Sequence, residues 1–189
     1  MRHQICAFLL KLWGFRVEGQ YPHAIPKCLI VVMPHTSNWD FPLGILVRCS
    51  LSAKGNFVAK DSLFKPPFGF IFYKLGGVPV DRSKNNNFVT SVIDTFEKRD
   101  ELKLVIAPEG TRKKVSRLKT GFYWIARGAG VPMILCKFDW GKRVVSFSEP
   151  VYTTDDAQRD FEGILDHFRG VPGCNVEQGI PADFQQQIV

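Results

Sequence analysis

The sequence predicts an α/β domain in which helices flank a central, largely parallel sheet. Three mainly apolar runs, Cys28–Met33, Leu102–Ala107 and Val131–Cys136, predict strands, and the first of them is unbroken, as is typical of a strand that is covered on both faces. Segments with apolar residues at helical spacing alternate with strand-like runs along the chain. Such an alternation is the pattern of a parallel sheet with helices on its faces.

The remaining elements follow the same alternation. We expect short strands at Phe15–Glu18, Asn56–Ala59 and Val78–Val80, and a further strand, Val144–Phe147, at an edge of the sheet. Helices are expected around residues 41–47, 88–99, 120–127 and 161–168. With 189 residues, the chain is expected to form one domain over 1–189. Its segment 171–189, which contains proline, glycine and three glutamines, is expected to be loosely ordered.

The charge of the chain predicts an anionic partner. The formal net charge is +7 and the isoelectric point about 9.3. Nucleic acid, anionic lipid head groups, coenzyme A phosphates and an acidic carrier protein all satisfy this condition. Basic residues form no clear stripe apart from Arg112–Lys114 and the nearby Arg117 and Lys119, and no nucleic-acid recognition motif is present. We therefore expect no nucleic acid among the partners.

Cysteine and histidine usage argues against a disulfide framework and against a metal site. The five cysteines are odd in number and form no C-x-x-C pair. Buried, reduced thiols in a cytoplasmic protein are the expected state. The four histidines show no metal-ligand spacing, so no metal is expected.

Two segments have a composition that suits a lipid surface. Residues 1–15 predict a helix with an apolar face, but the run Ile5–Leu10 is far shorter than the roughly 20 apolar residues that span a bilayer, and no cleavage site follows. This helix either packs on its own domain or lies in the head-group region. Residues 64–74 combine five aromatic side chains with flanking lysines, and either dip into a membrane, line an acyl-binding tunnel or pack as an ordinary loop.

Polar residues cluster where the predicted strands end. His35–Asp40 follows the first buried strand, Pro108–Arg112 follows the second, and Arg82 and Lys60 follow two shorter strands. In α/β sheets, functional groups gather at these strand ends, so the clusters predict one site built from several loops.

The first cluster has the residue types of a general base. An aspartate five positions after a histidine can reach the imidazole through the first helical turn and stabilise the imidazolium that forms on proton uptake. A histidine that only caps a helix is the alternative. Because no G-x-S-x-G elbow is present, the base is expected to act directly on a substrate hydroxyl. Arg112 offers a planar fork suited to phosphate, although any single basic residue can equally be a solvated surface charge.

These residues resemble a known family. His35 and Asp40 form an H-x-x-x-x-D motif, Gly77–Arg82 matches a G-x-x-x-x-R block, and Pro108–Arg112 matches a P-E-G-T-R motif. With a fourth block at Val131–Ile134, they look like the glycerolipid acyltransferases of the 1-acylglycerol-3-phosphate acyltransferase superfamily. The resemblance covers roughly residues 17–151.

The resemblance implies a fold, an activity and roles for single residues. The fold would be that of the glycerol-3-phosphate acyltransferases. His35 would be the general base and Asp40 its partner. The acceptor, most simply 1-acylglycerol-3-phosphate, would be bound by a set of residues at the loop ends: Lys60, Arg82, Glu109, Gly110, Thr111 and Arg112.

The same resemblance implies the other participants in the reaction. The donor would be acyl-CoA or acyl carrier protein, used as a co-substrate without any cofactor, and the protein would sit peripherally on the cytoplasmic face of a membrane. Pro34, Ala107 and Leu135 depart from residues common in the family. The acceptor therefore stays open among lysophosphatidic acid, another lysophospholipid and an aminolipid, and a non-catalytic lipid-binding relative remains the alternative.

Overall fold

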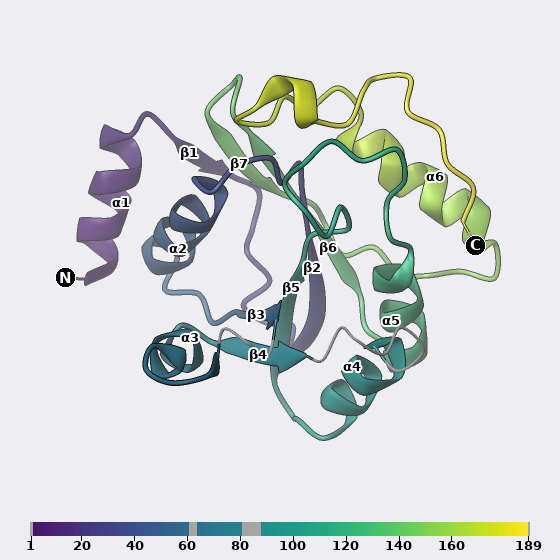
Figure 1. Cartoon of the computed structure of the whole chain (residues 1–189), viewed down its shortest axis with the longest axis horizontal. Coiled ribbons are helices and arrows are strands. Elements are labelled where there is room, and N and C mark those ends of the chain that lie inside the picture. The colour runs from purple at the N-terminus through teal and green to yellow at the C-terminus, as the bar shows by residue number, and fades with distance from the viewer. Residues whose placement is uncertain (1, 61–63, 81–87, 189) are drawn as a thin grey trace.

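The computed structural model describes residues 2–60, 64–80 and 88–188. Within them, seven strands form one sheet in the order β1-β7-β6-β2-β5-β3-β4 (Figure 1). Neighbouring strands run parallel except for the antiparallel pair of β6 and β7. The strands are β1 (Arg16–Glu18), β2 (Lys27–Met33), β3 (Asn56–Lys60), β4 (Gly77–Val80), β5 (Leu102–Ile106), β6 (Met133–Asp139) and β7 (Val144–Phe147).

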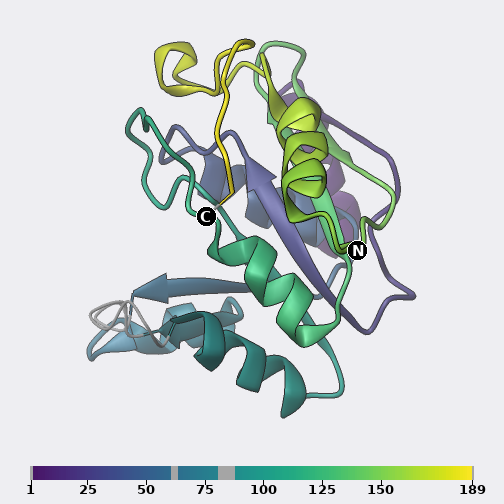
Figure 2. The same ribbon diagram turned by 90° about the vertical axis from the view of Figure 1, so that its right-hand side faces the viewer.

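Helices cover both faces of this sheet, which confirms the predicted fold class. The helices are α1 (Arg2–Leu12), α2 (Asp40–Ser50), α3 (Gly69–Lys74), α4 (Phe88–Glu97), α5 (Gly121–Ala129) and α6 (Ala157–Phe168), and a 3₁₀ turn, η3, spans Val176–Gln178. Figure 2 shows α4, α5 and α6 in front of the sheet, with α1 and α2 behind it.

Alternate residues of each central strand build the two cores. In β2, Leu29, Val31 and Met33 pack with α4, α5 and α6, whereas Cys28, Ile30 and Val32 pack with α1 and α2. Successive side chains of a strand point to opposite faces, so a strand buried on both sides must be apolar throughout. This requirement explains the unbroken apolar run of β2.

The prediction that Val144–Phe147 forms an edge strand is wrong. β7 lies between β6 and β1, and β1 forms the edge instead. β1 pairs with β7 through only three residues, Arg16 to Glu18. So short a strand has too little hydrophobic pattern to reveal its neighbour in the sequence.

The topology brings the candidate loops to one edge of the sheet. β2, β5, β3 and β4 are consecutive neighbours and all run parallel. Their carboxyl ends therefore point the same way. The loops that follow Met33 and Ile106 leave the sheet side by side, next to the end of β3 at Lys60.

The expectation of five reduced thiols is wrong for one pair. Cys6 of α1 and Cys49 of α2 form a disulfide, with 5.8 Å between their Cα atoms. Cys28 and Cys136 are free and buried, and Cys174 is free and half-buried. The pairing follows from the packing of α1 along α2, which joins cysteines 43 positions apart without any local spacing signal.

The helix α1 packs on its own domain and also leaves apolar side chains exposed. Leu10 is buried against α2, but Ile5, Phe8, Leu9 and Leu12 are exposed, with Phe8 at 65% and Leu12 at 73%. No helix among residues 2–60, 64–80 and 88–188 is both long enough and apolar enough to cross a bilayer.

The segment after Gly170 makes specific contacts that a loosely attached tail would lack. Ile180 is buried in the core beneath α6, and Phe184 and Ile188 pack against the same core. The Gln186 amide group hydrogen-bonds both the N–H and the carbonyl of Leu118, at 2.6 and 2.9 Å. Its proline, glycine and glutamine content indicated the absence of regular structure but not these contacts.

Candidate active site

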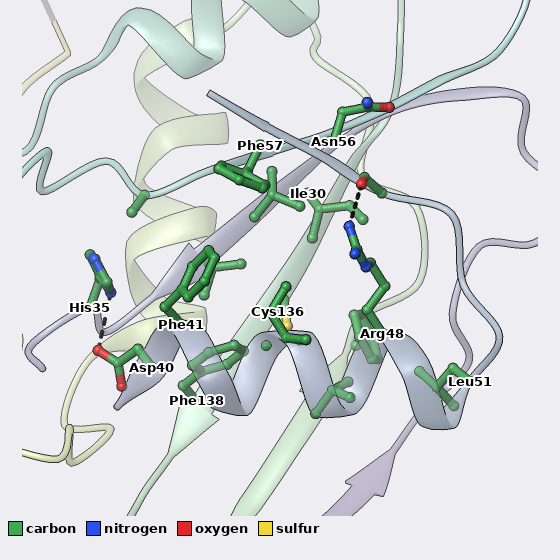
Figure 3. Close-up of a pocket in the computed structure, with 18 of the residues that line it drawn as sticks. Ile30, His35, Asp40, Phe41, Arg48, Leu51, Asn56, Phe57, Cys136 and Phe138 are labelled. Atoms are coloured by element: carbon green, nitrogen blue, oxygen red, sulfur yellow. Dashed lines mark hydrogen bonds and ion pairs between the residues drawn. The ribbon is translucent and has the colours of Figure 1, made fainter. Parts of the chain in front are cut away.

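His35 and Asp40 meet at the carboxyl end of β2. The chain leaves the strand through the cis peptide bond Met33–Pro34, and α2 begins at Asp40. His35 Nδ1 lies 3.1 Å from Asp40 Oδ2 (Figure 3). Because Nδ1 faces the carboxylate, Nε2 is the ring nitrogen left for another partner.

The Asp40 carboxylate is held by three further donors. The backbone N–H groups of Thr36 and Ser37 each donate to Oδ2 at 2.8 Å, and the indole N–H of Trp140 donates to Oδ1 at 2.8 Å. Asp40 is almost fully buried. A buried carboxylate is tolerated only when such donors replace its hydration. The network therefore fixes both the carboxylate and the loop that carries His35.

Trp140 is a residue of this site that the sequence analysis missed. It follows β6, 100 positions after Asp40. Its ring also packs edge-on against Trp13 and Phe15. A lone tryptophan after a buried strand carries no sequence signal for such a role, since an aromatic residue there is usually core.

Glu109 ties the loop after β5 to the loop after β2. The carboxylate accepts a hydrogen bond from the backbone N–H of His35 at 2.8 Å, and the residue is only 5% exposed. Burial raises the pKa of Glu109 to about 7, although hydrogen bonds from the backbone of His35 and from its own backbone oppose this shift. Its second oxygen, Oε2, has no partner among the described residues. The structure thus gives Glu109 a contact with the chain, while its expected contact with substrate stays a prediction.

The last three residues of the P-E-G-T-R motif lie at the surface. Gly110, Thr111 and Arg112 are exposed, and Arg112 lines the same pocket as His35. Gly110 has a φ of +64° and lies so close to Lys119 that an added Cβ would stand 2.9 Å from its Nζ. Lys119 therefore adds a positive charge to this loop.

Two expected site residues are only partly placed. Lys60 is the last residue of β3, and its side chain is outside what the structure describes. Arg82 lies outside the described residues altogether. Among the described residues, no group of three or more His, Cys, Asp or Glu is arranged to hold a metal ion.

A deep pocket of about 550 Å³ extends from His35 and Asp40 into the domain, between α2 and the sheet (Figure 3). Arg48 and Asn56 lie among its lining residues, at the end of α2 away from Asp40. Tyr21 also lines the pocket, and its hydroxyl donates to the carbonyl of Lys54, which follows α2. Gly44 in the middle of α2 leaves room opposite Phe138. The rest of the wall is mainly apolar and includes Ile30, Val32, Phe41, Val47, Leu51, Phe57, Val105, Cys136, Phe138 and Phe147.

Arg48 separates this apolar pocket from a second, basic hollow of about 490 Å³. Arg48, Gly55 and Asn56 line both spaces. The guanidinium Nη1 donates to the carbonyls of Gly55 and Leu75, and burial lowers the pKa of Arg48. The basic hollow lies between the start of α1 and the end of α3 and is lined on its outer side by Arg2, His3, Lys54 and Lys74.

The raised pKa of Glu109 predicts a pH dependence of stability. A proton bound more tightly in the folded state stabilises the fold fully below the unfolded pKa of 4.5, and this stabilisation is lost as the pH rises through about 7. In wild type, the free energy of unfolding should therefore fall by up to about 3 kcal/mol over this range, and in Glu109→Gln this decrease should be absent. In thermal unfolding from about pH 5 to pH 8, the Tm of the variant should rise relative to the Tm of wild type as the pH rises. The exposed Glu97→Gln is the control; parallel curves for all three proteins would contradict a buried, protonated Glu109.

Comparisons with known proteins agree with this fold and show the family of the chain. The crystal structure of the 1-acyl-sn-glycerophosphate (LPA) acyltransferase PlsC from Thermotoga maritima shares the fold, with a TM-score of 0.56 and 21% sequence identity over 87% of this chain and 77% of that chain. A search of curated proteins gave no match. The sequence model of the acyltransferase family matches residues 15–138, which include both His35–Asp40 and Pro108–Arg112. This chain belongs to the acyltransferase family.

Proposed function

We propose that this acyltransferase moves a fatty acyl group from acyl-CoA or acyl carrier protein to a hydroxyl of a lysophospholipid, with 1-acylglycerol-3-phosphate as the acceptor. The observation that carries the proposal is the His35–Asp40 pair, 3.1 Å apart, at the opening of a long apolar pocket. A base beside an acyl-sized cavity and a basic loop is what transfer from a thioester to a phosphate-bearing lipid requires.

In the proposed mechanism, His35 Nε2 takes the proton of the acceptor hydroxyl as its oxygen attacks the thioester carbonyl. Asp40 stabilises the imidazolium that forms, and its own position is held by Thr36, Ser37 and Trp140. The tetrahedral intermediate then collapses and breaks the carbon–sulfur bond. The imidazolium returns its proton to the leaving thiolate, so the step ends with an ester and a free thiol. Every group needed belongs to the chain or its substrates, so the proposal includes no cofactor.

The acyl chain is proposed to lie in the apolar pocket along α2. Its volume of about 550 Å³ and its mainly aliphatic and aromatic walls suit a fatty chain, which gains about 0.8 kcal/mol for each buried methylene. The chain would extend from the thioester at His35 toward Arg48, whose hydrogen bonds close the space from the basic hollow.

The acceptor phosphate is proposed to bind at the loop after β5. Arg112 lines the pocket beside His35, and Lys119 packs against Gly110. An arginine fork and a nearby ammonium are favourable partners for a phosphate monoester. Gly110 and Thr111 would offer backbone and hydroxyl contacts, and the resemblance adds Lys60 and Arg82. Glu109 would act mainly by fixing this loop against His35.

We also propose that the protein docks peripherally on an anionic membrane through the side that bears α1 and α3. Both helices lie on the same side of the molecule (Figure 1) and expose apolar residues, including Phe8 and Leu12 in one and Phe70 and Ile71 in the other. The basic hollow between them supplies positive charge for phosphate head groups. Apolar side chains around a basic centre are the composition of a membrane-binding surface.

The general-base role predicts a large loss of turnover in His35→Ala. The variant should fold normally and lose about 10²–10⁴-fold in kcat, because the acceptor hydroxyl keeps its proton. The measurement is thiol release from palmitoyl-CoA with and without lysophosphatidic acid. His23→Ala, in the loop that enters β2 at the end opposite His35, is the matched control. Near-normal activity of His35→Ala would sink the mechanism. If wild type releases no thiol with any acceptor, first from palmitoyl-CoA and then from palmitoyl acyl carrier protein, the non-catalytic lipid-binding interpretation is favoured.

The proposed acyl pocket predicts that Gly44 governs donor chain length. An added Cβ at Gly44 would make only ordinary contact with Phe138, at 3.6 Å, so a leucine can be accommodated in the helix but its branches fill the pocket. In Gly44→Leu, the ratio of kcat/KM for palmitoyl-CoA over octanoyl-CoA should fall by about 10-fold or more. Gly163→Leu in α6, where an added Cβ meets open space, is the matched control. An unchanged ratio would place the acyl chain elsewhere.

The docking proposal predicts charge-dependent vesicle binding. Lys54→Glu combined with Lys74→Glu should weaken sedimentation with vesicles of phosphatidylglycerol and phosphatidylcholine by about 10-fold or more, since each basic residue near the surface contributes about 1 kcal/mol. Lys98→Glu with Arg99→Glu, at the end of α4 on the other face of the sheet, changes the net charge equally. Equal loss in both double variants would mean that net charge, not this surface, drives binding.

A further inference from the structure

The segment 172–178 packs directly against the loop that carries His35. Its backbone approaches so closely at Gly173 that an added Cβ would lie 2.5 Å from Thr36 Oγ1 and 2.7 Å from Thr36 Cγ2. Thr36 itself is only 1% exposed. The segment lies beyond residues 15–138, which the acyltransferase family model matches, so this contact is a feature of the rest of this chain.

Asn175 makes two hydrogen bonds to Thr36. Its side-chain amide Nδ2 donates to the Thr36 carbonyl at 2.8 Å, and its backbone N–H donates to Thr36 Oγ1 at 3.1 Å. Both partners belong to a residue that is otherwise enclosed by the catalytic loop. Asn175 therefore fixes the loop that carries His35 through both its backbone N–H and its side-chain amide.

The peptide group after Thr36 connects Asn175 to Asp40. The Thr36 carbonyl and the Ser37 N–H are part of one planar unit, so fixing the oxygen also fixes the direction of the N–H. That N–H donates to Asp40 Oδ2 at 2.8 Å, the same oxygen that faces His35 Nδ1. A rotation of this peptide would withdraw a donor from the carboxylate that orients the imidazole.

The same segment also supports the other side of the Asp40 carboxylate. The backbone N–H of Trp140 donates to the Pro172 carbonyl at 3.0 Å, while the Trp140 indole donates to Asp40 Oδ1. In the amide orientation that satisfies its neighbours, Gln178 donates to the Thr36 carbonyl at 2.9 Å and to the Arg112 carbonyl. Residues 172–178 thus join the loops that carry His35 and Arg112.

We propose that Asn175 is a positioning residue of the acyl-transfer reaction, and that segment 172–178 is a strap that keeps the His35–Asp40 pair in its reactive geometry. This inference rests on the proposed role of His35 as the base. Asn175 touches neither substrate nor the reacting atoms in this proposal. It acts through the Thr36 peptide, so its loss should lower turnover without weakening the binding of donor or acceptor.

The test compares Asn175→Ala and Asn175→Asp with wild type. The aspartate keeps the size of the side chain but turns the Nδ2 donor into an acceptor that faces the Thr36 carbonyl. Both variants should lose about 10-fold in kcat, with KM for palmitoyl-CoA and for lysophosphatidic acid within about twofold of wild type. Val176→Ala, a neighbouring residue that is 71% exposed, is the matched control and should behave as wild type.

Hydrogen exchange gives a readout that needs no substrate. The N–H groups of Thr36 and Ser37, which donate to Asp40, should exchange faster in both Asn175 variants, while peptides from β5 and α5 stay unchanged. If exchange at residues 35–40 is unaltered, or if kcat stays within twofold of wild type, the positioning role is wrong. A rise in KM with unchanged kcat would overturn it as well.

The two readouts also separate this inference from the proposed function. A wild-type protein that transfers no acyl group to any lysophospholipid would contradict the proposed function, while the exchange measurement would still decide whether Asn175 holds the loop. If Asn175→Ala does not fold, Asn175→Asp is the deciding variant. If both fail to fold, the residue is structural and the positioning role is overturned.

Discussion

One buried carboxylate organises the loops at the carboxyl end of β2, where the candidate active site lies. Asp40 accepts hydrogen bonds from two backbone N–H groups, the Trp140 indole and the His35 ring. These donors come from the loop after β2 and from the end of β6, so the carboxylate can be satisfied only when the sheet has formed. An acid left with fewer donors in this buried place would cost several kcal/mol. The geometry of the proposed base therefore depends on the completed fold rather than on a local turn.

The charged groups around Asp40 lie in separate places. Glu109, whose pKa burial raises to about 7, accepts a hydrogen bond from the His35 backbone N–H and so holds that backbone from the neighbouring loop. Basic side chains lie on either side of the apolar pocket. Arg112 lines the pocket near His35, with Lys119 close to Gly110 in the same loop, and Lys54 and Lys74 line the adjacent basic hollow. A phosphate-bearing lipid and an anionic surface would therefore meet different parts of the molecule, with the apolar pocket between them.

The features that could be predicted from the sequence are those that depend on local residue patterns. Apolar runs revealed the buried strands, and the spacing of His35 and Asp40 with Pro108–Arg112 revealed both the family and the loops that meet. Features created by long-range packing were missed. Trp140 hydrogen-bonds Asp40 although the two residues are 100 positions apart. Cys6 pairs with Cys49 only because α1 packs along α2. β1, and not β7, is the edge strand, although only three of its residues pair with β7. The contacts of residues 172–178 likewise arise from polar groups in irregular backbone, where no periodicity exists to read.

The helix α2 carries both ends of the proposed reaction channel. Asp40 begins it, Gly44 faces the pocket at its middle, and Arg48 closes the pocket near its end. Eight residues at 1.5 Å each set a span of about 12 Å between the acid and the arginine. Because the helix is a stiff rod, neither end can shift along the channel without the other. The disulfide from Cys49 to Cys6 joins α2 to α1, the helix with exposed apolar residues. If α1 docks on a lipid surface as proposed, its movement would therefore reach the Asp40 carboxylate as a rigid displacement.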